Sequence, residues 1–99
     1  MRILSKPTLI NFFEQPDYSD SKAPLLSWHG HALKASWQEP ADVKIDFGSA
    51  SILREGRVVF NIAGNKYRLV TWINYDFGII YIKFIGTHKQ YDAIDAQTI

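Results

Sequence analysis

Cysteine is absent from this chain of 99 residues. The protein therefore has no disulfide scaffold, no thiolate zinc site and no cysteine nucleophile. Long hydrophobic runs are also missing, because the most apolar stretches, 58–60 and 78–82, fall far short of the roughly 18 residues of a membrane span. Residues 1–7 lack the apolar stretch of a secretory signal, which takes about 7 to 15 residues. We therefore expect a cytoplasmic protein without a membrane segment.

Neither sign of charge is in large excess over the whole chain, because the formal net charge is only +1. The charge is unevenly distributed, however. Residues 1–53 hold five basic and six acidic side chains, residues 54–91 hold six and two, and residues 92–99 hold two acidic ones. This small basic excess suits a site for a few phosphates. A solvated sheet edge guarded by lysines explains it equally well.

Linker-like and low-complexity segments are lacking too, and the composition is that of an ordinary globular protein, with 46% hydrophobic and 21% charged residues. A chain of this length is typical of one domain, so we expect residues 1–99 to form a single domain.

The first half of the sequence predicts two helices. Ser5 is placed to cap the first, and Gln15 and Pro16 end it. The second is expected to begin around residues 19–21 and to run to about Ser36, with apolar side chains on one stripe. Together the two helices are expected to form a hairpin.

The second half predicts strands. The composition of residues 38–42 indicates a turn, and residues 50–53 could form a short strand. Three segments rich in β-branched and aromatic residues follow, joined by short glycine-containing connections: 58–62, 66–74 and 79–85. We expect an α+β fold, with the helical hairpin packed on a three- to four-stranded antiparallel sheet that is covered on one face and partly on the other.

Candidate chemistry gathers around the strand at 66–74 and just after the last strand. The period of two places Lys66 and Arg68 on one face, where two cations could bind a phosphate or stabilise a phosphorane. Beyond the last strand, His88 offers an imidazole, and Tyr91 offers a ring on which a base could stack. Each feature alone is also typical of an ordinary exposed surface. His29 and His31, two residues apart, do not form a helical zinc pair, and no metal or cofactor is expected.

Two sequence blocks resemble the HigB toxins of bacterial type II toxin-antitoxin systems. The first block is Phe-Asn-Ile-x-Gly-Asn-x-Tyr-Arg-Leu-Val over residues 60–70, and the second is Thr-His-Lys-x-Tyr-Asp over residues 87–92. The resemblance implies a RelE-like fold and an activity as an mRNA interferase, an endoribonuclease that cuts transcripts on translating ribosomes. It also implies an antitoxin of the HigA type, a helix-turn-helix protein, with operator DNA bound only through the toxin-antitoxin complex.

The resemblance also assigns roles to residues of this chain. Arg68 would stabilise the charged phosphate, while His88 and Tyr91 would supply proton transfer and base stacking. The cations expected to hold the RNA backbone are Lys66, Lys83 and Lys89.

The expected mechanism is attack of an RNA 2′-hydroxyl on the adjacent phosphate, because an RNA substrate brings its own nucleophile. The rival hypotheses are a non-catalytic module whose basic face binds RNA or an acidic partner, and a toxin remnant that has lost its activity.

Overall fold

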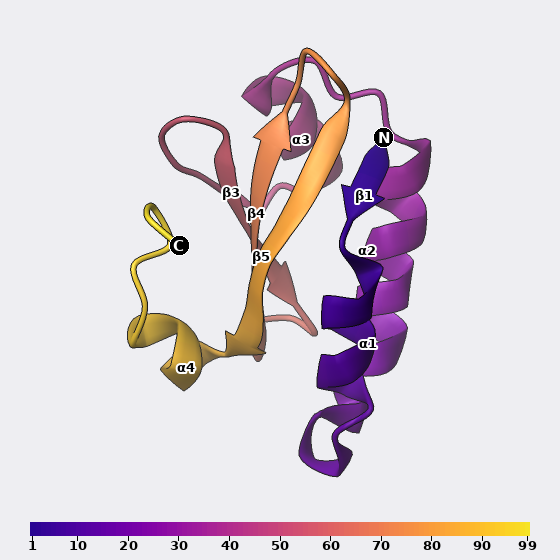
Figure 1. The fold of residues 1–99 in the computed structure, drawn as a ribbon, viewed down its shortest axis with the longest axis vertical. Coiled ribbons are helices and arrows are strands. Elements are labelled where there is room, and N and C mark those ends of the chain that lie inside the picture. The colour runs from indigo at the N-terminus through magenta and orange to yellow at the C-terminus, as the bar shows by residue number, and fades with distance from the viewer.

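The protein has an α+β fold with a five-stranded sheet, seen in a computed structural model that describes residues 1–99 (Figure 1). The strand order is β1-β5-β4-β3-β2, and every neighbouring pair is antiparallel except the parallel pair β1 and β5. The bounds are β1 Arg2–Leu4, β2 Ser51–Ile52, β3 Arg57–Ile62, β4 Tyr67–Asn74 and β5 Ile79–Thr87. The predicted fold class is confirmed, and the sheet is larger than predicted because the short strand β1 pairs with β5.

The helices are α1 (Lys6–Phe13), the 3-10 helix η1 (Pro16–Ser21), α2 (Lys22–Lys34), α3 (Pro40–Asp46) and α4 (His88–Asp92). The predicted hairpin corresponds to α1 and α2, although Ser5 makes no side-chain capping bond. The turn predicted over 38–42 is wrong in its second half, where α3 begins at Pro40. Proline suits the first helical position because its missing N–H would have no intrahelical partner there.

The main hydrophobic core lies between the helices and one face of the sheet (Figure 1). From the sheet, Phe60, Tyr67 and Leu69 are almost fully buried in it, and Leu25 and Trp28 of α2 pack from the other side. Alternate side chains along β4 face this core, since Tyr67, Leu69 and Ile73 all belong to it.

The opposite face of the sheet is covered only in part. The segment that follows α4 packs Ala96 against Val59 and Val70 to form a second, small core. The side chain of Gln97 donates to the carbonyl of Arg54 and accepts from its amide, each at 2.8 Å. The prediction of a partly covered second face is thereby confirmed.

The strand β5 contains an irregularity in its pairing with β4. Val70 pairs with Phe84 and Thr71 pairs with Ile82, so Lys83 is left without a partner in a bulge. Beyond the bulge, Arg68 lies opposite Gly86, and β5 leads directly into α4.

None of the helices has the length and apolar character needed to cross a membrane.

Candidate active site

The helix α4 is held at its first residue by a reciprocal pair of hydrogen bonds. The Thr87 hydroxyl accepts from the backbone N–H of Gln90 at 3.1 Å, and the Gln90 side-chain oxygen accepts from the backbone N–H of Thr87 at 2.8 Å. This is a capping box, which satisfies two amides that the helix itself leaves unpaired. The signal, threonine followed three residues later by glutamine, stands in the sequence and was not used to predict a helix there.

Arg68 projects from the start of β4 towards this helix. Its guanidinium donates to the carbonyl of Asn65 at 3.0 Å, and its central carbon lies 6.0 Å from the ring centre of Tyr91. A guanidinium over an aromatic face is a favourable electrostatic contact. Two of the three predicted catalytic residues, far apart in the sequence, are therefore neighbours in the structure.

His88, the third predicted catalytic residue, begins α4. Its backbone N–H donates to the carbonyl of Lys66 at 3.3 Å, which joins the first turn of the helix to the turn before β4. Its Nε2 lies 3.5 Å from a carboxylate oxygen of Asp92, one helical turn on, and both side chains are more than half exposed. The imidazole is thus open to solvent, with a carboxylate next to it that can orient it.

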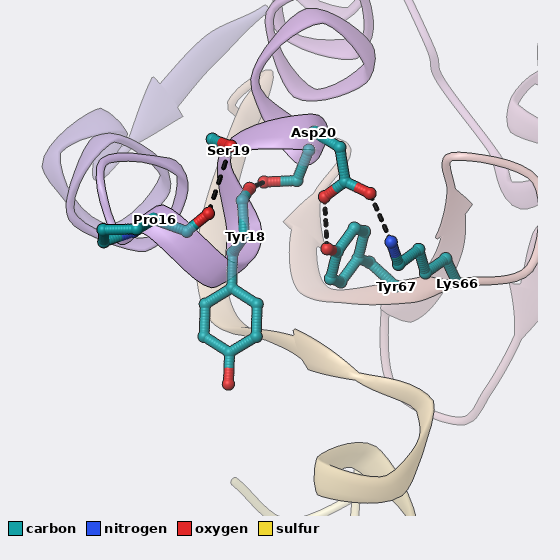
Figure 2. A network of polar contacts seen from close by, with 7 residues as sticks. Pro16, Tyr18, Ser19, Asp20, Lys66 and Tyr67 are labelled. Atoms are coloured by element: carbon teal, nitrogen blue, oxygen red, sulfur yellow. Dashed lines mark hydrogen bonds and ion pairs between the residues drawn. The ribbon is translucent and has the colours of Figure 1, made fainter.

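The three lysines predicted to hold RNA have different surroundings. Lys83, in the bulge of β5, and Lys89, on α4, are exposed and form no ion pair. Lys66 instead donates to the carboxylate of Asp20 on η1 (Figure 2). The prediction that Lys66 shares the face of Arg68 is wrong, because Lys66 lies in the turn before β4, where the strand period does not apply, and the carboxylate draws it towards the helices.

Asp20 also binds a second group, the hydroxyl of the fully buried Tyr67, on its other oxygen (Figure 2). Hydrogen bonds first from Lys66 and then from Tyr67 hold the pKa of Asp20 below its usual value. The hydrogen bond to Asp20 raises the pKa of Lys66, and burial, followed by the hydrogen bond to Asp20, raises the pKa of Tyr67. The network ties the turn before β4 to η1. Sequence reasoning missed Asp20, which lies 46 residues from Lys66 and carries no local signal.

Tyr18, two residues before Asp20, supports the site from the same short helix (Figure 2). Its ring stacks on Phe12 with ring centres 4.5 Å apart, and its hydroxyl accepts from the side-chain amide of Gln90 at 3.2 Å. Through Asp20 and Tyr18, η1 contacts both the strand that carries Arg68 and the helix that carries His88 and Tyr91.

The chemistry available at this end of the sheet follows from these groups. A guanidinium can stabilise a charged phosphate, an aromatic ring can stack with a base, and an exposed imidazole can transfer protons. Lys89 adds a cation one residue from His88. The set suits a phosphodiester between unpaired bases.

Comparisons with known proteins give both a family and relatives for this chain. Residues 21–94 match the family model described as HigB_toxin, RelE-like toxic component of a toxin-antitoxin system. The chain is 26% identical over 98 residues to the mRNA interferase toxin HigB of Escherichia coli strain K12, covering 97% of this chain and 92% of that protein. The mRNA interferase HigB of Shigella flexneri matches with the same identity and coverage.

Proposed function

Because the chain belongs to the HigB toxin family, the RelE-like toxic component of a toxin-antitoxin system, we propose that it is an mRNA interferase that cuts messages on translating ribosomes. The observation that carries the proposal is the contact of Arg68 with Tyr91, one turn of α4 from His88. The relatives that match nearly the whole chain bear the name mRNA interferase.

The proposed reaction is an internal transfer at one phosphodiester. The 2′-oxygen of the RNA bonds to the adjacent phosphorus, and the bond from phosphorus to the 5′-oxygen breaks, which leaves a 2′,3′-cyclic phosphate. Arg68 stabilises the extra negative charge of the phosphorane. His88 moves a proton between the 2′-hydroxyl and the 5′-oxygen, and Tyr91 stacks with the neighbouring base. The route uses side chains and the substrate's own nucleophile, and calls for no metal.

Dependence on the ribosome follows from the small charge of the site. Four net positive charges over residues 54–91 allow few phosphate contacts, so free RNA is bound weakly at cellular salt. A ribosome that holds the message in position supplies the missing orientation, which in well-oriented reactions is worth up to about 7 to 11 kcal/mol. Lys83 and Lys89 then need only add weak contacts to the RNA backbone.

A toxic component of a toxin-antitoxin system has an antitoxin as its partner. We propose that this antitoxin is a helix-turn-helix protein of the HigA type, and that operator DNA is bound only by the complex. Because the proposed substrate is a message under translation, the toxin acts in the cytoplasm.

The test is expression of the protein without its antitoxin. Growth should stop, and mapping of RNA ends should show cuts within translated regions and none in untranslated transcripts. The Arg68→Ala variant, expressed to the same level, should allow growth. Normal growth with abundant folded parental protein would favour the non-catalytic module or the inactive remnant.

A further inference from the structure

The structure points to a second RNA contact on the open face of the sheet, formed by a pair of aromatic side chains that the proposed reaction does not use. Trp72 of β4 and Tyr81 of β5 are register partners, and their rings stack with centres 4.8 Å apart and planes 24° apart. Both are partly exposed, and neither belongs to the two hydrophobic cores or packs against them.

The orientation of Trp72 is fixed although its face is partly open. Its indole N–H donates to the carbonyl of Glu55 at 3.0 Å. Gly56 lies against its edge, where an added Cβ would stand 3.1 Å from the indole nitrogen and only 2.6 Å from the carbonyl of Ile73. A large aromatic ring that is held by its edge and left out of the core is suited to stacking.

The pair lies in line with the candidate active site. Arg68 and Trp72 are four residues apart on β4 and share one face, so about 13 Å of strand separates them. The exposed Lys83 lies in the bulge of β5, between Tyr81 and Gly86. Gly86 is the register partner of Arg68. Val70, which lies between Arg68 and Trp72 on this face, is buried under the segment after α4, so an RNA strand that contacts both residues would pass beside that segment, on the β5 side where Lys83 is exposed.

Charge and shape select the ligand. Trp72 also lines an open hollow of about 520 Å³, whose other walls include the carboxylate residues Glu55 and Asp76. Carboxylates disfavour a phosphate there, whereas aromatic faces accept any base and cations further along the face hold the backbone. We infer that the Trp72–Tyr81 pair is a stacking platform for an unpaired base of the RNA strand whose cleaved phosphate lies at Arg68. This inference rests on the proposed function.

The test measures the affinity of the full chain for a labelled 2′-O-methyl oligoadenylate of about eight nucleotides at low ionic strength. The 2′-O-methyl group prevents cleavage, so binding is read without reaction. Trp72→Leu and Tyr81→Leu should each weaken binding about 10-fold, since a stacked base is worth about 1–3 kcal/mol. Tyr81→Phe keeps the ring and should bind like the parent. The control is Phe77→Leu, which changes an exposed aromatic in the neighbouring turn that does not line the hollow, and it should also have no effect.

A second readout uses cleavage on programmed ribosomes, where Trp72→Leu should raise KM and leave kcat near the parental value. If one of the leucine variants fails to fold, the other carries the test. Parental affinity in both leucine variants, with Arg68→Ala still abolishing cleavage, would overturn the platform and leave the proposed function standing. The platform would equally be refuted if these variants weakened only the complex with the antitoxin. Absence of both RNA binding and cleavage in the parent would refute the platform and the proposed function together.

Discussion

Gly86 is the position at which one added methyl group should separate activity from overall folding. It is buried at the end of β5, opposite Arg68. A Cβ there would lie 2.5 Å from the ring of Phe84 and 2.7 Å from the side-chain oxygen of Gln90. Both neighbours must therefore shift: Phe84, which packs against the small second core, and the Gln90 side chain, which caps α4.

Displacing Gln90 removes its hydrogen bond to the amide of Thr87 and thus the capping box of α4. Loss of a cap costs about 0.5–2 kcal/mol, and in a domain of this size each kcal/mol lowers Tm by about 4–8 °C. Because α4 has only five residues, its first turn should fray and shift His88 and Tyr91. A shift of about 1 Å at reacting groups can cost on the order of 100-fold in rate. We expect Gly86→Ala to lower cleavage on ribosomes about 10- to 100-fold.

The assay pairs thermal unfolding, followed by circular dichroism, with cleavage of a message on programmed ribosomes. The matched control is Gly30→Ala within α2, where an added Cβ meets nothing within 4 Å. That variant should keep full activity and gain up to about 1 kcal/mol of stability, because alanine favours a helix over glycine. Gln90→Ala, which removes the cap without adding a methyl group, should share the cleavage defect of Gly86→Ala. Parental Tm and parental cleavage in Gly86→Ala would show that the contact between Gly86 and Gln90 does not hold α4 in place.

Three further predictions concern the network around η1 and one buried histidine. Tyr67→Phe should lower the free energy of unfolding by about 1–1.5 kcal/mol, because it deletes the buried hydroxyl that donates to Asp20; urea titration measures this, and an unchanged midpoint would contradict it. Since the pKa of Asp20 is lowered in the folded protein, its contribution to stability is present above its ordinary pKa of 3.8 and is lost as the pH falls through the folded value. Asp20→Asn should therefore flatten the loss of stability below about pH 4, and an unchanged acid profile in this variant would argue against the network. Burial, followed by the charge of Lys6, lowers the pKa of His29 from 6.5, so stability should be constant above this value and should fall as the pH drops below it, because the unfolded chain binds the proton more readily. His29→Gln should remove this slope below about pH 6.5, and persistence of the slope would place its origin in another group.

The strands could be predicted because their signal is local. β-branched and aromatic residues, bounded by glycine-containing turns, marked β3, β4 and β5 to within one or two residues. By contrast, β1 is three residues long and its parallel partner β5 lies at the other end of the sequence, so no local pattern marks it. The helix α3 was missed because it is short and buries only Val43, which leaves no repeating apolar pattern to detect.

The residues of the candidate site could be predicted from the sequence, but the residues that hold them in place could not. Arg68, His88 and Tyr91 came from sequence blocks, and the structure brings Arg68 against Tyr91. Asp20 and Tyr18 act across 47 and 72 residues of sequence, on Tyr67 and Gln90 respectively, which no local pattern encodes. Lys66 was misplaced because it lies in the turn before β4, where strand alternation does not apply, and its partner there is the distant Asp20.

Cleavage of one transcript by purified protein, free and on programmed ribosomes, tests the proposed active site when the parent is compared with Arg68→Ala and Arg54→Ala. Arg54 is an exposed arginine that hydrogen-bonds Gln97 only through its backbone, so it controls for charge alone. We expect cuts by the parent and by Arg54→Ala on ribosomes, little cutting of the free transcript, and a loss of cleavage of about 100- to 1000-fold in Arg68→Ala. Parental cleavage by a folded Arg68→Ala would contradict the assignment of the active site to this end of the sheet, and equal rates on free and ribosome-bound RNA would contradict dependence on the ribosome.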